Sequence, residues 1–225
     1  MYNKLGILGG MGPMATYTLY KNIIESTTAA RDQDHINAVI LNASHIPDRT
    51  EGILQRGKSP LPFLLEELKI LEGAGCDLIA VPCNTSHYFF DEMQKSCSSE
   101  ILNMIDLTGE KLKDLGITKT YLMATEGTIK IGVYKKYLSK KNIDIMPASE
   151  FETAEMMRVI YEIKAGKAPD TSGLCEIAGK YARLGCEKII LGCTELSTEK
   201  GLAGDIFIDA MDVLKEKILE KFGKI

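Results

Sequence analysis

Short apolar runs alternate with longer amphipathic runs through almost the whole chain, and this alternation narrows the folds it can adopt. The short runs are typical of buried β-strands, and most are bounded by glycine or polar residues. The longer runs place apolar residues at helical spacing, as in Leu61, Leu64 and Leu68. Strands that alternate with helices form parallel sheets covered on both faces. The predicted fold class is therefore α/β.

The expected elements follow from these runs. Strands are expected at residues 4–9, 35–44, 76–82, 119–125, 143–146, 186–192 and 206–209. Helices are expected at residues 13–26, 61–75, 88–97, 107–116, 130–141, 150–166, 171–185 and 210–223. Pro13 marks the start of the first helix, because proline suits the first helical position. A short apolar piece stands at residues 101–104.

An internal repeat divides the chain. GCDLIAVPCNT begins at Gly75 and GCEKIILGCTE begins at Gly185, so Cys83 and Cys193 stand 110 positions apart. The repeat predicts two pseudo-symmetric halves, each a parallel, Rossmann-like sheet flanked by helices, with the site in the cleft between them. The expected halves are residues 1–105 with 208–225, carrying Cys83, and residues 106–207, carrying Cys193.

The composition limits which binding partners and which cellular location are expected for the protein. The net charge of −4 and the pI of about 5.5 disfavour a general surface for nucleic acid or an anionic membrane. The N-terminal segment is typical of a strand, turn and helix rather than a signal peptide, so a cytoplasmic location is expected. Six cysteines in such a chain do not indicate a disulfide framework. The cysteines expected to be buried and inert are Cys76, Cys97, Cys175 and Cys186.

Cys83 and Cys193 differ because each ends a predicted strand and is followed by polar residues. Open α/β sheets bind ligands beyond the carboxyl ends of their strands, where backbone amides can stabilise a thiolate. An ordinary thiol has a pKa of about 8.5, so modest stabilisation yields a useful base. Two equivalent thiols suit two-base racemisation, in which one thiolate removes an α-proton and the other thiol protonates the opposite face.

The sequence resembles the aspartate/glutamate racemase family, whose members work without a cofactor. The resemblance rests on GILGGMGPMAT, PDRT, VPCNTSH, MATEGT and LGCTEL, an ordered set that runs from Gly6 to Leu196. Related glutamate racemases usually have a histidine where this chain has Glu195, so the aspartate racemase-like branch fits better. Branches that keep a single cysteine act as decarboxylases or isomerases, and this chain has both Cys83 and Cys193.

The resemblance implies a role for each motif. Cys83 and Cys193 are the implied catalytic acid/bases. Arg49 and Lys164 are the implied contacts to substrate carboxylates, and a planar guanidinium suits a carboxylate in its own right. The other implied substrate-binding residues are Met11, Thr16, Asn84, Thr85, Thr125, Thr194 and Glu195. The resemblance further implies a homodimer that acts on a small acidic amino acid, aspartate first, without a cofactor.

Other functions stay open on the residues alone. The Gly10-Met11-Gly12 loop fits a dinucleotide-binding fingerprint of an oxidoreductase, but the second strand ends near Asn42, without the acidic residue that the fingerprint needs. Cys83 and His87 have the spacing of two metal ligands on a helix, although the chain has no Cys-x-x-Cys. The two thiols could also form a redox-sensitive disulfide.

Overall fold

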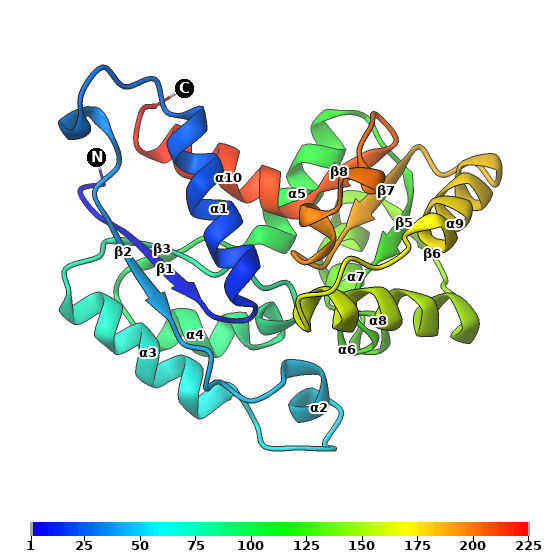
Figure 1. Cartoon of the computed structure of the whole chain (residues 1–225), viewed down its shortest axis with the longest axis horizontal. Helices are drawn as coiled ribbons and strands as arrows, with labels where there is room; N and C mark the ends of the chain where they lie inside the picture. The colour runs from blue at the N-terminus through cyan, green and yellow to red at the C-terminus, as the bar shows by residue number, and fades with distance from the viewer. Residues whose placement is uncertain (1, 225) are drawn as a thin grey trace.

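Two separate parallel sheets organise the protein. The computed structural model describes residues 2–224. The first sheet has the strand order β2-β1-β3-β4, and the second has the order β6-β5-β7-β8 (Figure 1). The strands are β1 (Leu5–Gly9), β2 (Ala38–Asn42), β3 (Leu78–Ala80), β4 (Glu100–Ile101), β5 (Lys119–Met123), β6 (Asp144–Met146), β7 (Lys188–Leu191) and β8 (Phe207–Asp209). The predicted α/β fold with two similar halves is confirmed.

Helices connect successive strands and cover the sheets. The α-helices are α1 (Pro13–Ser26), α2 (Arg49–Ile53), α3 (Leu61–Gly73), α4 (Phe90–Ser96), α5 (Met104–Asp114), α6 (Glu126–Ile131), α7 (Val133–Leu138), α8 (Glu150–Lys164), α9 (Ser172–Arg183) and α10 (Ala210–Lys221). Short 3₁₀ turns include η2 (Thr85–Phe89) and η4 (Leu196–Thr198), which directly follow the two cysteine loops. None of the helices among residues 2–224 is long and apolar enough to span a membrane.

The two halves fix their central strands with the same kind of hydrogen bond, from a backbone N–H to a carboxylate. In the first sheet, the Asp77 carboxylate accepts a hydrogen bond from the backbone N–H of Lys4 at 3.0 Å. In the second, the Glu187 carboxylate accepts one from the backbone N–H of Lys119 at 3.2 Å. Each acidic residue precedes a strand that leads to one of the two cavity cysteines, and each partner lies at the start of the neighbouring strand, β1 or β5. The sequence repeat therefore corresponds to a repeated structure.

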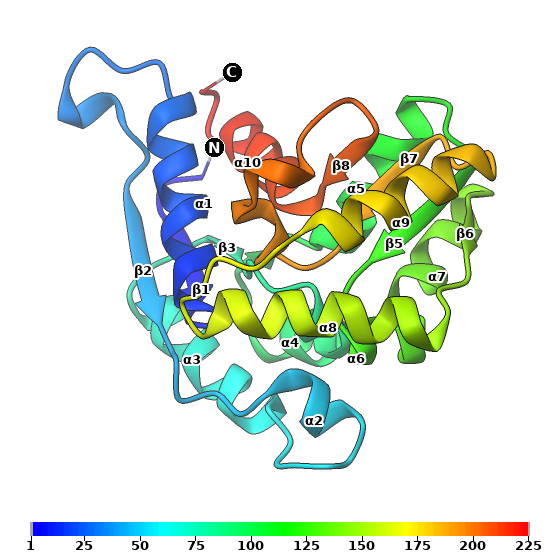
Figure 2. The ribbon, with the colours of Figure 1, turned by 45° about the vertical axis from the view of Figure 1, so that its right-hand side comes forward.

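The last helix joins the halves. α10 lies against α1 of the first half and against α5 near the junction (Figures 1 and 2). A single apolar core includes Leu5 from β1, Leu122 from β5, and Met211 and Leu214 from α10. The assignment of α10 to the first half and the division of the chain near residues 105 and 208 stay predictions.

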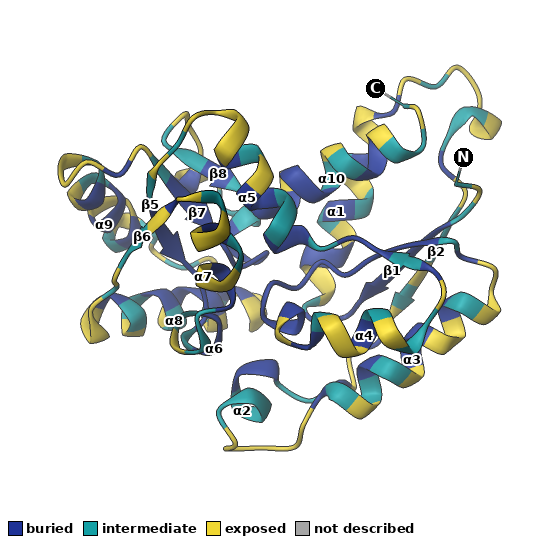
Figure 3. Cartoon of the chain, turned by 180° about the vertical axis from the view of Figure 1, so that it is seen from behind, coloured by how far each residue is buried: buried dark blue, intermediate teal, exposed yellow. Residues whose placement is uncertain are grey.

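Burial follows the layers of the fold. Figure 3 shows the central strands in the buried colour and the outward faces of the helices in the exposed colour. Edge strand β2 is an exception, because Ile40 is 40% exposed. Tyr17 on helix α1 of the same half is also exposed.

Three expectations need correction. The single helix expected at residues 130–141 is broken at Gly132, whose φ of 67° is left-handed and suits glycine. Cys175 is exposed rather than buried, because it lies on the outer face of α9, and Cys97 is only half-buried. Helix α2 was not expected at all, although Asp48 caps it by accepting a hydrogen bond from the Glu51 N–H at 3.0 Å.

Candidate functional site

A small cavity lies where loops from the two sheets meet. It has a volume of about 10 Å³ and is formed beyond the carboxyl ends of β1, β3, β5 and β7. Its lining comprises Met11, Asp48, Arg49, Thr50, Cys83, Asn84, Thr85, Thr125, Lys164, Cys193, Thr194 and Glu195. The structure thus brings together every predicted site residue except Thr16.

Thr16 serves the loop instead of the cavity. Its hydroxyl accepts a hydrogen bond from the Gly10 N–H at 2.9 Å and donates to the Gly12 carbonyl at 3.0 Å. These bonds fix the glycine loop at the start of α1. Met11, from the same loop, lines the cavity, and its sulfur accepts a hydrogen bond from Ser86 at 3.3 Å.

Cys83 is positioned by a buried histidine. His87 Nδ1 donates to the Cys83 carbonyl at 2.9 Å, and its Nε2 accepts from the Met104 N–H at 3.3 Å. Burial lowers the pKa of His87, so the ring is neutral. Both ring nitrogens are engaged with the backbone, which leaves neither free for a metal. His87 therefore holds the Cys83 loop and does not line the cavity.

Cys193 has a different partner. Its Sγ donates a hydrogen bond to Glu195 Oε2 at 2.9 Å. Burial raises the pKa of the Cys193 thiol well above its usual range, and the charge of Glu195 raises it further, against the opposing effect of Lys164. Cys193 is therefore protonated at neutral pH in the free protein.

Lys164 brings a cation close to both cysteines. Its Nζ lies 4.0 Å from Glu195 Oε1. Burial lowers the pKa of Lys164, but the negative charge of Glu195 opposes burial, and the net pKa is raised. Lys164 thus brings a charged ammonium to the cavity from a residue that is partly open to solvent.

Arg49 enters the cavity as a buried guanidinium with a free donor. Nη1 donates to the carbonyls of Ile46 and Pro47, both at 3.1 Å, and Nη2 donates to the Met11 carbonyl at 3.4 Å. Among the described residues, Nε–H has no hydrogen-bond partner. A planar guanidinium with a free donor suits a carboxylate.

Helix α2 brings Arg49 against the second half. Arg56, just beyond α2, makes two hydrogen bonds to the Glu126 carboxylate of α6, at 3.0 and 3.3 Å. The Asp48 carboxylate accepts a hydrogen bond from the Tyr161 hydroxyl of α8 at 3.1 Å. The segment that carries Arg49 is therefore attached to both halves, and it covers the cavity.

Asn84 is oriented by a residue of the opposite half. The Tyr134 hydroxyl donates to Asn84 Oδ1 at 2.6 Å, and both side chains are buried. Because the amide oxygen is fixed in this way, Asn84 Nδ2 is directed elsewhere, and it is buried with no hydrogen-bond partner among residues 2–224. The cavity thus contains an unused donor.

Threonine hydroxyls connect the two cysteine loops. The Oγ1 atoms of Thr85, Thr125 and Thr128 lie 3.0 Å from one another in each pair. Thr194 donates to the Pro82 carbonyl, next to Cys83, at 3.1 Å. Thr128 was missed in the sequence, and its signal is the Thr-x-x-Thr spacing in MATEGT, which lets the Thr125 cap meet the Thr128 N–H.

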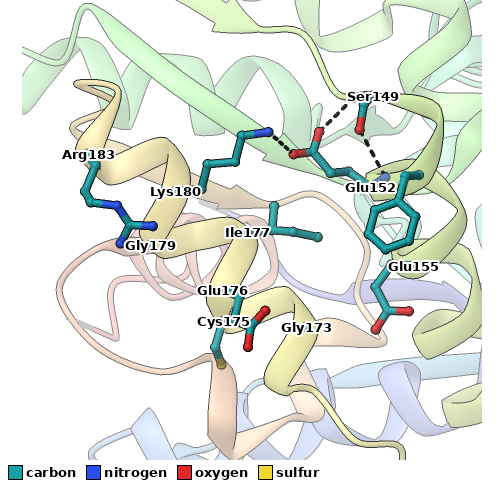
Figure 4. A pocket seen from close by; sticks show the side chains of 11 residues that line it. Ser149, Glu152, Glu155, Gly173, Cys175, Glu176, Ile177, Gly179, Lys180 and Arg183 are labelled. Carbon is teal, nitrogen blue, oxygen red and sulfur yellow. Dashed lines mark hydrogen bonds and ion pairs between the residues drawn. The ribbon is translucent and has the colours of Figure 1, made fainter.

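A larger groove, which neither Cys83 nor Cys193 lines, lies between α8 and α9 (Figure 4). Glu152 in this groove accepts hydrogen bonds from Lys180 at 2.6 Å and from the Ser149 N–H at 2.8 Å. Burial alone would raise the pKa of Glu152, but these bonds outweigh it and hold the pKa at about 2. The cluster completes the capping box of α8, and none of the predicted site residues lines the groove.

The fold matches solved racemases over nearly the whole chain. An aspartate racemase from Picrophilus torridus gives a TM-score of 0.87 at 30% identity, with 99% of this chain and 95% of that chain covered. An aspartate racemase homologue from Pyrococcus horikoshii OT3 gives a TM-score of 0.78 at 27% identity, with 98% and 99% covered. The broad specificity amino-acid racemase RacX of Bacillus subtilis strain 168 is 24% identical over 197 residues, which is 86% of each chain.

A fold and cavity of this kind define an isomerase of the amino-acid racemase type. Residues 8–218 match the family described as Asp/Glu/Hydantoin racemase, and the chain belongs to that family. The structure also disfavours a dinucleotide-binding site, because β2 ends at Asn42 and has no acidic residue at its end. Across residues 2–224, no group of three or more His, Cys, Asp or Glu side chains has the arrangement of a metal site.

Proposed function

We propose that this protein interconverts L- and D-aspartate by a two-base mechanism, without a cofactor. Glutamate or a broader set of amino acids is the second candidate, and the similarity to RacX favours keeping it. One observation carries the proposal. Cys83 and Cys193, from equivalent loops of two different sheets, line the same small cavity together with two cations, Arg49 and Lys164.

In the proposed reaction, one cysteine removes a proton from the substrate and the other cysteine returns one. The Cys83 thiolate takes the α-proton, so the Cα–H bond breaks and its electron pair stays on the substrate. The Cys193 S–H bond then breaks, and its proton forms the new Cα–H bond on the opposite face. The reverse direction exchanges the roles of the two cysteines.

The substrate's α-proton is much less acidic than a thiol, and the cavity has features that reduce this difference. The Arg49 Nε–H and the unused Asn84 Nδ2 can donate to a carboxylate on which negative charge develops. Burial strengthens these interactions, because little water is present to screen them. Positioning of both thiols around one carbon supplies a further part of the rate.

Proton exchange tests the proposed reaction directly. The protein is incubated with L-aspartate, and separately with D-aspartate, in deuterated water, and the products are separated on a chiral column. Deuterium at Cα together with interconversion of the enantiomers supports the proposal. No exchange and no interconversion with either aspartate or glutamate would refute it.

Assembly and location remain proposals of the same kind. A homodimer is supported by the exposed apolar side chains Met14, Tyr17 and Ile24, which recur at helical spacing along α1, because exposed apolar patches mark interaction surfaces. Sedimentation analysis tests the dimer. A cytoplasmic location is tested by fractionation of cells that express the chain.

A further inference from the structure

Two acidic side chains line the cavity, and they differ in how their oxygens are used. Asp48 Oδ1 accepts the Glu51 N–H at 3.0 Å, and Asp48 Oδ2 accepts the Tyr161 hydroxyl at 3.1 Å. Glu195 Oε2 accepts the Cys193 thiol at 2.9 Å. Glu195 Oε1 is buried and has no hydrogen-bond partner among residues 2–224. The cavity therefore contains one unused anionic acceptor.

The surroundings of Oε1 leave room for a donor. Lys164 Nζ is 4.0 Å away, which is an ion-pair separation and too long for a hydrogen bond. Gly12 has no side chain there, and a Cβ at that position would come within 3.1 Å of Oε1. An unsatisfied buried oxygen of a charged group is costly, so a cationic donor that enters the cavity would bind favourably at this point.

The unused groups of the cavity match the chemistry of an amino acid. The free donors, Asn84 Nδ2 and the Arg49 Nε–H, suit carboxylates. The free acceptor suits an ammonium group. A dicarboxylate without an amine would satisfy the donors but would leave Glu195 Oε1 unpaired.

Building on the proposed racemase function, we propose that Glu195 Oε1 binds the α-ammonium group of the substrate. Because Oε2 of the same carboxylate holds the Cys193 thiol, an ammonium at Oε1 places the adjacent Cα beside Sγ. Glu195 thus binds the substrate and positions the acid. The site takes α-amino dicarboxylates in preference to dicarboxylates that lack the amine.

The test compares two ligands of one carbon skeleton, L-aspartate and succinate. Binding is measured by calorimetry on the Cys83→Ala chain, in which turnover is blocked, with and without Glu195→Gln. We expect Glu195→Gln to weaken aspartate binding by about tenfold to hundredfold, the range for a lost charged hydrogen bond. Succinate binding should stay the same or tighten, because one negative charge is gone.

Two further variants sharpen the result. Glu199→Gln removes the same charge from the same loop, outside the cavity lining, and should change neither ligand. Gly12→Ala places a methyl group against Oε1 and should weaken aspartate more than succinate. Retained succinate binding shows that each variant is folded.

Equal losses for both ligands, or no loss for either, would overturn the ammonium site and leave Glu195 as a counter-ion of Lys164. Absence of aspartate binding to the Cys83→Ala chain would overturn it as well. The racemase proposal is judged separately on the wild type. A wild type without turnover, combined with a selective loss in Glu195→Gln, would refute the racemase and keep the ammonium site.

Discussion

The two cysteine loops occupy the same place in their respective halves, yet their side chains are not in equivalent surroundings. The Cys83 loop follows β3, which pairs with β1 in the first sheet. The Cys193 loop follows β7, which pairs with β5 in the second sheet. Cys83 is held through its backbone carbonyl by neutral His87, and none of the described residues accepts a hydrogen bond from its thiol. Cys193 is held through the thiol itself by Glu195.

The repeated fold therefore determines where the two cysteines lie, whereas individual side chains determine the surroundings of each thiol. The repeat supplies two strands that direct a cysteine from each sheet toward one cavity. The carboxylate of Glu195 and burial favour the protonated thiol at Cys193. Under the proposed two-base reaction, Cys193 would therefore act first as the proton donor.

The strongest test of the comparison removes each thiol in turn. Cys83→Ala and Cys193→Ala should each lower the rate of racemisation by about 10²–10⁴-fold, the usual contribution of a general acid or base. Chiral chromatography in both directions measures the rate. Cys76→Ala and Cys186→Ala are matched controls, because these cysteines form the other repeated pair and lie outside the cavity lining. Full activity in either cavity variant would exclude the two-base scheme.

The sequence predicted the elements that depend on local patterns. Buried strands such as β3 and β7 are continuous apolar runs, and the repeat placed their cysteines correctly. Thr16 was misassigned to the cavity because a short motif does not show which way a helical side chain points. Tyr134 was missed as a supporting residue, because its hydrogen bond to Asn84 joins segments far apart in the chain, which no local pattern encodes. Thr128 was missed although its spacing from Thr125 is local.

The next test concerns the cations, which the two halves contribute unequally. Arg49 comes from the first half and has a planar guanidinium with several donors, whereas Lys164 from the second half is a point charge. Arg49→Lys keeps the charge but loses the planar guanidinium, so kcat/KM for aspartate should fall by about 10–100-fold. Arg56→Lys, on the exposed side of the same segment, is the control and should retain most activity. Equal activities of the two variants would contradict the carboxylate role of Arg49.

A pH measurement sharpens the difference between the thiols. Burial and the charge of Glu195 raise the pKa of Cys193, so its thiolate is scarce at neutral pH. Glu195→Gln removes the charge and lowers that pKa, and Cys193 should then react with iodoacetamide at lower pH, several-fold faster near neutrality. Peptide mass spectrometry measures the extent of alkylation at each cysteine separately, with Cys83 as the internal reference. The same acceleration at both cysteines would show a general opening of the cavity instead.

The smallest expected effect concerns stability and another equivalent pair. After β4, Asn103 caps α5, and after β8, Asp209 caps α10. Burial raises the pKa of Asp209 to about 6, although Ser197 and the Met211 N–H partly oppose the shift. The protonated form is therefore favoured in the folded state, so the free energy of unfolding should fall as the pH rises from about 4 to about 6, by at most about 3 kcal/mol.

Asp209→Asn gives α10 an asparagine cap, like that of α5. The variant should remove the dependence of the free energy of unfolding on pH. The variant should match the wild type near pH 4 and be more stable at pH 7, because the amide has no charge to bury and still caps the helix. Urea unfolding at the two pH values measures this, with Asp205→Asn, an exposed neighbour, as the control. A wild-type stability that is flat between pH 4 and pH 6 would mean that the folded protein does not favour the protonated carboxyl. In that case the two caps would be equivalent, and the asymmetry between the halves would be confined to the thiols.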